Sequence, residues 1–144
     1  MKNRFLLAVD DSPGSSKAAE FALERAKRAS ADIVVAYVIE WSQYSFNTPE
    51  ENAERHRRRE EEIERATKQI VDPVVEKLNA DGVKASGLVR HGHPAQTLCE
   101  LAEENDVSQI FIGRLGATGL KSMLFGSVAG NLAQSSTIPV TVVP

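Results

Sequence analysis

Residues 5–39 read FLLAVDDSPGSSKAAEFALERAKRASADIVVAYVI, and they predict a strand, a helix and a second strand in succession. The apolar runs Phe5–Val9 and Ile33–Ile39 have the length of buried strands. Between these runs, alanines recur at helical spacing and share one helix face: Ala18, Ala22, Ala26 and Ala29. A strand, a helix and another strand form a right-handed crossover unit whose two strands are parallel.

The remainder of the chain continues this alternation. Further apolar runs predict strands at Val83–Val89, Gln109–Ile112 and Val140–Val143. Stripes with helical spacing lie between the runs, one formed by Ile63, Ala66, Ile70, Val74 and Leu78, the other by Ala95, Leu98, Cys99 and Ala102. The alternation predicts an α/β fold, with one doubly wound domain over residues 1–144 and a largely parallel sheet covered by helices on both faces.

The expected helix boundaries carry local signals. Thr48-Pro49-Glu50-Glu51 is a capping box with proline at the first helical position, and it opens the second helix. Gly82 suits the left-handed residue that ends this helix, and His93-Pro94 opens the third helix. Pro73 falls inside the second helix and is expected to kink or break it.

Composition argues against several classes of protein. The net charge of −3 provides no basic surplus for a nucleic-acid backbone. No apolar run approaches the length of about 18 residues that a membrane span needs, and the opening residues are expected to form a first buried strand rather than a signal peptide. Cys99 is the only cysteine, so an internal disulfide is excluded and a reducing cytoplasm is the expected location.

Residues 111–134 read FIGRLGATGLKSMLFGSVAGNLAQ, and they follow the fourth predicted strand. Gly113, Gly116 and Gly119 recur at intervals of three residues, and Gly126-Ser127 begins the last predicted helix. Glycines let backbone N–H groups approach a ligand closely, and a helix N-terminus favours a bound phosphate. A plain glycine-rich turn followed by a helix cap is the alternative interpretation.

The surroundings of these glycines narrow the choice of motif. Arg114 and Lys121 supply positive charge, and the hydroxyl of Ser127 adds a donor. Residues 119–122 lack the Gly-Lys-Ser adjacency of a P-loop, and no G-x-G-x-x-G follows the first strand. The spacing that remains is G-x2-G-x9-G-S, formed by Gly113, Gly116, Gly126 and Ser127.

This spacing resembles the nucleotide-binding signature of the universal stress protein family, in its ATP-binding branch. The resemblance extends over nearly the whole chain and includes Val9-Asp10-Asp11-Ser12, Ala36–Ile39, Gly92-His93-Pro94-Ala95 and Ile138–Val143. It implies a five-stranded parallel sheet in the order 3-2-1-4-5. In that order the winding reverses between strands 1 and 4, and ligands occupy the crevice beyond the carboxyl ends of these strands. Asp10 lies at the end of strand 1, and Gly113 lies at the end of strand 4.

The resemblance also implies which residues contact the nucleotide. Ala8 and Asp10 would lie against the adenine and ribose, the main chain of Val38 would contact the adenine edge, and Ile112 would pack against the base. The backbone of Gly113, Gly116, Gly126, Ser127 and Val128 would hold the ribose and phosphates, with Arg114, Ala117 and Gly119 completing the cofactor-binding set. Asp11 stands where family members often have glycine, and its carboxylate can repel phosphate or recruit Mg²⁺ or Mn²⁺ to the ATP.

Three functions are consistent with these residues. The first is an ATP-binding module of the universal stress type, which acts in a stress response or in regulation. The second is a slow ATPase or phosphotransferase, but no histidine or glutamate is convincingly placed beside the phosphate loop, so we assign no catalytic residue. The third is an interaction protein with a vestigial site, and the intact glycine spacing argues against it.

Other segments admit competing interpretations. His91 and His93 suggest a metal pair, but a loop role is favoured because zinc needs three or four protein ligands. Cys99 is expected to be a buried structural thiol. The aromatic loop Trp41–Phe46 fits a lid over the base, a partner surface or packing under the second helix. For the charged stretch Glu50–Glu62, a solvated or frayed helix face is favoured over an interaction surface.

The last predicted strand indicates an oligomer. Val140–Val143 is apolar and lies at the sheet edge in the implied order, where unpaired backbone groups favour association. Two copies that pair antiparallel about a two-fold axis would form a homodimer through this strand, and the resemblance implies the same arrangement. A monomeric edge blunted by Pro139 and Pro144 is the alternative.

Overall fold

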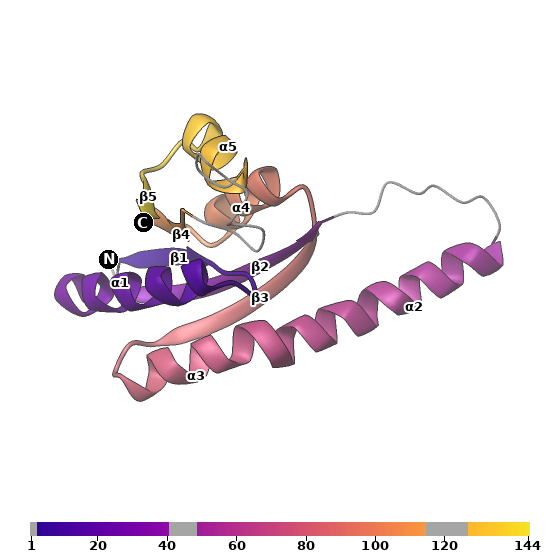
Figure 1. Cartoon of the computed structure of the whole chain (residues 1–144), viewed down its shortest axis with the longest axis horizontal. Coiled ribbons are helices and arrows are strands. Elements are labelled where there is room, and N and C mark those ends of the chain that lie inside the picture. The colour runs from indigo at the N-terminus through magenta and orange to yellow at the C-terminus, as the bar shows by residue number, and fades with distance from the viewer. Residues whose placement is uncertain (1–2, 41–48, 115–126) are drawn as a thin grey trace.

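The computed structural model of the chain describes residues 3–40, 49–114 and 127–144 (Figure 1). Its centre is a five-stranded sheet in which every strand pair is parallel and the order is β3-β2-β1-β4-β5. The strands are β1 (Arg4–Ala8), β2 (Asp32–Glu40), β3 (Ala85–Gly92), β4 (Gln109–Gly113) and β5 (Val140–Val143). The expected fold class and strand order are therefore confirmed, and β2 and β3 continue past the predicted runs at their carboxyl ends.

Helices connect the strands and cover both faces of the sheet (Figure 1). They are α1 (Pro13–Ala29), α2 (Pro49–Ala66), the π-helical turn η1 (Thr67–Val71), α3 (Asp72–Ala80), α4 (Pro94–Glu104) and α5 (Ser127–Ser135). One face carries α1, η1 and α3, whose buried side chains form one apolar cluster with the strands. The other face carries α4 and α5, which form a second cluster with them.

Successive side chains of the central strand enter different clusters. Phe5, Leu7 and Val9 belong to the cluster that includes α1, whereas Leu6 and Ala8 belong to the cluster of α4 and α5. Alternation along a strand that is buried on both faces explains why this segment is a continuous apolar run. Burial of each large side chain contributes about 1.5–3 kcal/mol, so β1 anchors both layers.

The expected kink or break at Pro73 takes the form of the π-helical turn η1, which interrupts the α-helix just before this proline without ending the helical path. Helical structure runs from Pro49 to Ala80 through η1 without a gap. Because α3 begins at Asp72, Pro73 lies in its first turn, where a missing N–H removes no hydrogen bond of α3. The wide η1 turn also directs buried Val71 at the sheet, where a Cβ added to Gly87 would overlap its Cγ1.

Two of the expected helix boundaries are confirmed. Gly82 follows α3 with φ +91°, a left-handed conformation that glycine adopts without strain. The third predicted helix, α4, begins at Pro94, and His93 is its extended N-cap. Thr48 of the expected capping box lies outside the described residues.

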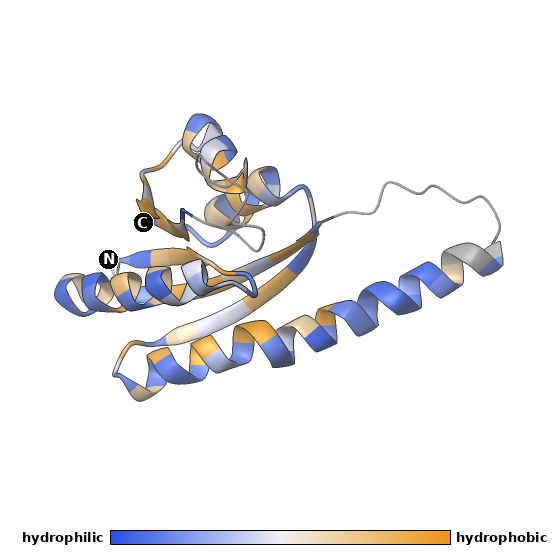
Figure 2. Ribbon diagram, in the orientation of Figure 1, coloured by the Kyte–Doolittle hydropathy of each residue, from blue (hydrophilic) through white to orange (hydrophobic). Residues whose placement is uncertain are grey.

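The first half of α2 projects beyond the sheet and is strongly hydrophilic (Figure 2). Residues 53–61 are exposed, apart from half-buried Arg55 and Arg59. Pairs four residues apart join Glu54 to Arg58 at 3.4 Å and His56 to Glu60 at 3.1 Å, and such exposed pairs add only about 0.3–0.5 kcal/mol each. Across the part of the chain that the structure describes, no helix has the length and apolar character of a membrane span.

Candidate functional site

The carboxyl ends of β1 and β4 meet at the point where the winding of the sheet reverses. In the sheet register Ala8 pairs with Ile112, and the two strands then diverge into different connections. The chain after β1 turns through Asp10 into α1, while the chain after β4 leaves through Arg114. Parallel sheets of this kind bind ligands in the crevice beyond such strand ends, and Asp10 and Gly113 lie at these ends.

Asp10 is held by the first turn of α1. Its carboxylate oxygen Oδ1 accepts hydrogen bonds from the hydroxyls of Ser12 and, at 2.8 Å, Ser15. The backbone N–H of Asp10 donates to the Ser15 hydroxyl at 2.7 Å. These bonds orient the carboxylate, and among the described residues none of the hydrogen bonds engages Oδ2. One oxygen of Asp10 is therefore available to a ligand hydroxyl or cation.

Gly113 allows the end of β4 to lie against α1. A Cβ added to Gly113 would lie 2.6 Å from the carbonyl oxygen of Gly14 and 2.8 Å from its carbonyl carbon. On the other side, the Arg114 N–H donates to the Val143 carbonyl at 2.8 Å. This close approach gives the first glycine of the motif a packing role, which the sequence reasoning missed because Gly14 is distant along the chain.

The edge of β2 is open beyond the end of β1. The Ala36 carbonyl accepts a hydrogen bond from the Val9 N–H at 2.9 Å, and the β1–β2 register ends at the Ala8–Ala36 pair. Alternate residues of a strand direct their backbone polar groups to the same side, so Val38 presents its N–H and C=O toward the crevice. Ala8 and Ile112 are buried and Val38 is half-buried, all in the cluster of α4 and α5.

The last helix, α5, packs in the same apolar cluster as α4. Ser127 is the exposed first residue of α5 and Val128 is half-buried against the sheet, while Arg114 at the end of β4 is exposed. The expected start of this helix at Gly126-Ser127 thus agrees with the structure to within one residue. The remaining motif residues lie outside the described ranges, and their roles stay predictions: Gly116, Ala117, Gly119 and Gly126.

Negative charge gathers at the carboxyl end of β2. Tyr37 is half-buried on the face that carries α1 and α3. Burial raises the pKa of its phenol, and the carboxylates of Asp10, Asp11 and Glu62 raise that pKa further. A phenolate here would face three negative groups, so the neutral hydroxyl is the stable form at physiological pH.

Titration of Tyr37 provides a test of this electrostatic environment. We expect its pKa to lie above the ordinary value of about 10. Because the folded-state pKa is raised, the unfolded chain loses this proton first, and stability should decline as the pH rises through that range. The absorbance difference between the native protein and Tyr37→Phe isolates one phenol, since Tyr44 is the only other tyrosine. A difference curve with its midpoint at or below about 10 would contradict the assignment.

His91 belongs to a strand rather than to a loop, which corrects the expected loop role. It lies in β3, its side chain is 11% exposed, and its Nε2 lies 3.0 Å from Glu62 Oε2. The pair joins the end of β3 to α2, and this contact was invisible in sequence because the residues are far apart. His93 is exposed at the start of α4. Within the described ranges, no group of three histidine, cysteine, aspartate or glutamate residues is arranged to hold a metal.

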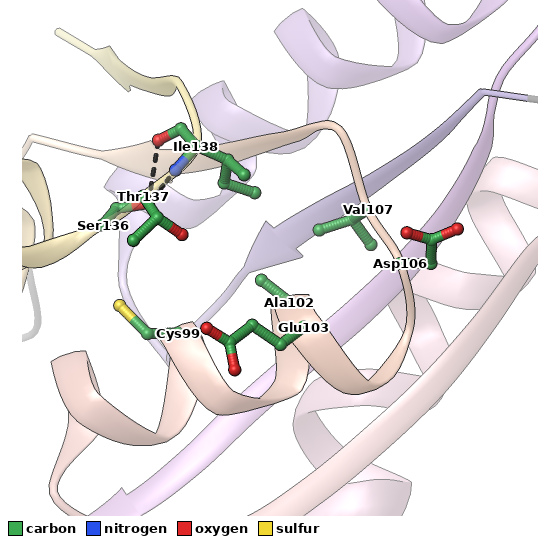
Figure 3. A pocket seen from close by; sticks show the side chains of 8 residues that line it. All are labelled: Cys99, Ala102, Glu103, Asp106, Val107, Ser136, Thr137 and Ile138. Atoms are coloured by element: carbon green, nitrogen blue, oxygen red, sulfur yellow. Dashed lines mark hydrogen bonds between the residues drawn. The ribbon is translucent and has the colours of Figure 1, made fainter.

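Cys99 lines a separate cavity at the amino-terminal edge of the sheet (Figure 3). The cavity has a volume of about 250 Å³ and lies between α4 and the turn from α5 to β5. The Cys99 Sγ lies 3.9 Å from the Ser135 Oγ, and the residue is half-buried. The thiol expected to be buried is therefore only half-buried against the core, because Leu98 and Ala102 occupy the core-facing positions of α4.

The sequence model of the universal stress protein family matches residues 1–144. The chain belongs to the universal stress protein family. Among relatives, it is 31% identical over 150 residues to universal stress protein YxiE of Bacillus subtilis, covering 99% of each chain. The family assignment implied by the glycine spacing is thus confirmed.

Solved structures of universal stress proteins share the fold. The structure of MJ0577, from Methanocaldococcus jannaschii, has a TM-score of 0.82 at 24% identity and covers 99% of this chain and 96% of that one. An Archaeoglobus fulgidus universal stress protein in complex with dAMP has a TM-score of 0.68 at 20% identity, covering 99% and 98%. A universal stress protein in complex with cAMP has a TM-score of 0.67 at 19% identity, covering 99% and 97%. Some structural neighbours therefore bind adenine nucleotides.

Proposed function

We propose that this universal stress protein binds ATP in the crevice beyond β1 and β4 and acts as a nucleotide-dependent stress-response or regulatory module. The observation that supports this proposal is the position of the candidate residues in the fold. The strand order brings Asp10, Val38, Ile112 and Gly113 to one edge of the sheet, although they are separated by up to 103 positions in the sequence. The cytoplasm is the proposed location, because a reducing compartment suits the single thiol.

The nucleoside half of the site uses the described residues. The Val38 backbone would read the adenine edge, and the apolar side chains of Ala8 and Ile112 would form the wall beside the base. Asp10 would accept a ribose hydroxyl through Oδ2, since its Oδ1 already accepts from Ser12 and Ser15. Because the serine hydroxyls already hold this carboxylate in place, its side chain would lose little conformational entropy when the nucleotide binds.

The phosphate half of the site relies on the glycine motif. Backbone N–H groups of Gly116, Gly126 and Ser127 would donate to the phosphates, and the N-terminus of α5 adds the positive end of its dipole. Arg114 is exposed at the end of β4 and supplies a charge that phosphate favours. Asp11 is exposed beside the site, where it could bind Mg²⁺ or Mn²⁺ carried by the nucleotide.

The complexes of related proteins support an adenine nucleotide as the ligand class. Universal stress proteins of the same fold hold dAMP and cAMP, which share the adenine base with ATP. In each of these ligands, a strand backbone could hydrogen-bond the adenine and a carboxylate could accept a hydrogen bond from the sugar. The glycine spacing is the feature that favours a nucleotide with a longer phosphate chain.

A test of the function begins with freshly purified protein. The protein is denatured, and any released nucleotide is identified by chromatography and mass spectrometry. Released ATP supports a binding module, released ADP or AMP favours the slow ATPase or phosphotransferase, and a released flavin contradicts both. With Mg²⁺ or Mn²⁺ added, we expect the protein to release phosphate from ATP at a rate far below about 10 s⁻¹. Phosphate release at that rate by the native protein, together with its loss in Asp10→Ala, would contradict the binding-module proposal.

We further propose that two copies of the chain pair through β5. This strand pairs with β4 on one side and forms the sheet edge, and Val142 is only half-buried there. An apolar edge of this kind invites another strand, and an antiparallel two-fold contact would cover both copies.

The dimer is tested by Val142→Lys, which places a charge on each paired edge. We expect light scattering to show a dimer for the native chain at micromolar concentration and a monomer for the variant, because like charges would face each other across the two-fold axis. Thr137→Lys adds the same charge at an exposed position before β5 and should remain dimeric. A monomeric native protein would rule out the proposal.

A further inference from the structure

A groove separates α1 from η1 and α3 on the face of the sheet opposite α4 and α5. It has a volume of about 480 Å³ and begins at Asp10 and Asp11. The proposed adenine wall, formed by Ala8, Val38 and Ile112, lies in the other cluster. The groove is therefore a second concavity, which meets the nucleotide crevice only at the aspartate end.

The walls of this groove are mainly apolar. The residues that form them are contributed by both helices: Ala19, Leu23, Ile70, Pro73, Val74 and Leu78. Sites for small organic ligands have volumes of about 300–1,000 Å³, apolar walls and a few polar groups that fix orientation. The groove meets this description, and its volume corresponds to one small molecule. A docked protein would bury about 800 Å² on each partner, which is far more surface than this groove offers.

The two ends of the groove differ in charge. At one end lie the carboxylates of Asp10 and Asp11 and the hydroxyls of Ser12 and Ser15. At the other end the only cation that lines the described groove is Lys77, whose Nζ lies 3.9 Å from Glu20 Oε1. The charge of Lys77 is thus balanced locally, whereas within the described ranges no salt bridge pairs Asp10 or Asp11 with a cation. The same two aspartates raise the pKa of neighbouring Tyr37.

We propose that this groove binds an amphipathic organic cation, with an ammonium group at Asp10 and Asp11 and a hydrocarbon body along the apolar walls. An ammonium group has three N–H donors and no acceptor, so carboxylates and hydroxyl oxygens are its appropriate partners. An anionic amphiphile would face repulsion at the aspartates, and a neutral one would gain the apolar contact and a hydrogen bond but no charge–charge attraction. The apolar walls are not part of the nucleotide crevice, but Asp10 and Asp11 lie at the junction of the two sites, so the cation is proposed for the nucleotide-free protein.

The test uses three probes with the same chain length: hexylammonium, 1-hexanol and hexanoate. Each is titrated into the full-length, ¹⁵N-labelled protein, and amide shifts are followed by NMR. Hexylammonium should shift amides of α1 and α3 saturably, and 1-hexanol should bind about 10-fold more weakly, since only the ammonium adds charge–charge attraction to its hydrogen bonds with the carboxylates. Hexanoate should give no saturable shift. If 1-hexanol bound as tightly as hexylammonium, the groove would be a non-polar site and the proposal would be overturned. Saturable binding of hexanoate would also overturn it.

Variants locate the site. Asp11→Asn, at an exposed position, should weaken hexylammonium about 10-fold, whereas Asp81→Asn, exposed beyond α3, should leave it unchanged. Ser16→Trp should occlude the groove from its exposed rim without altering the core, and Ser86→Trp makes the same change on β3 as the control. Unaltered hexylammonium binding in both Asp11→Asn and Ser16→Trp would refute the groove as the site.

Discussion

Replacing Gly113 with alanine is expected to lower the free energy of unfolding by about 3 kcal/mol, the upper end of the usual range for overpacking. The added Cβ would lie 2.6 Å from the Gly14 carbonyl oxygen and 2.8 Å from the carbonyl carbon. Those are backbone atoms in the first turn of α1, and they cannot rotate away as a flexible side chain can. Either β4 or α1 must move, and urea denaturation followed by circular dichroism measures the cost.

Gly82→Ala is the matched control for this substitution. Its Cβ would meet no atom within 4 Å, but its φ of +91° is unfavourable for alanine. We expect a cost of about 1–2 kcal/mol from backbone conformation alone. If Gly113→Ala were no more destabilising than Gly82→Ala, the close contact between β4 and α1 at Gly113 would be contradicted.

Replacing Gly126 with valine should weaken ATP binding about 100-fold, which corresponds to about 2.8 kcal/mol at about 1.4 kcal/mol per tenfold change. This expectation rests on the proposed function. A branched side chain at the third glycine of the motif would occupy the space assigned to phosphate and hold it away from the backbone donors. Calorimetric titration with ATP measures the affinity, and circular dichroism verifies that the variant is folded.

Ser127→Ala provides a graded comparison at the next position. It removes one neutral hydroxyl, so the loss should be about 0.5–1.5 kcal/mol, or roughly 2- to 13-fold in affinity. Gly116→Val should behave like Gly126→Val. Wild-type affinity in Gly126→Val would refute the phosphate site, and an equal loss in Ser127→Ala would show that the glycine is not the critical element.

The strands and helices were largely predictable because each depends on neighbours in the chain. The apolar run Phe5–Val9 and the alanine stripe of α1 both follow from backbone periodicity, and the structure buries both except Ala29, which is half-buried. The form of the interruption before Pro73 was not predictable. It is the wide turn η1, which places Val71 over Gly87, and local propensity does not report that contact.

The candidate site divides in the same way. Asp10 and Gly113 could be placed at strand ends from sequence, and the family resemblance supplied the strand order that makes those ends neighbours. The resemblance did not reveal that Ser12 and Ser15 hold Oδ1 of Asp10. It implied a contact through the Val38 main chain but not the structural cause, which is that β2 continues past the end of β1, because strand register depends on the paired strands.

Local pattern alone was sufficient for the α/β class, the helix starts at Pro94 and Ser127 and the glycine motif, because these features are encoded by residues within a few turns of one another. Long-range packing was needed for the Gly113 contact with Gly14, the His91 pair with Glu62 and the groove between α1 and α3. Each of these joins segments far apart in the chain. The physical reason is that side-chain pattern specifies which face of an element is buried, whereas the partner on that face is selected only when the layers pack.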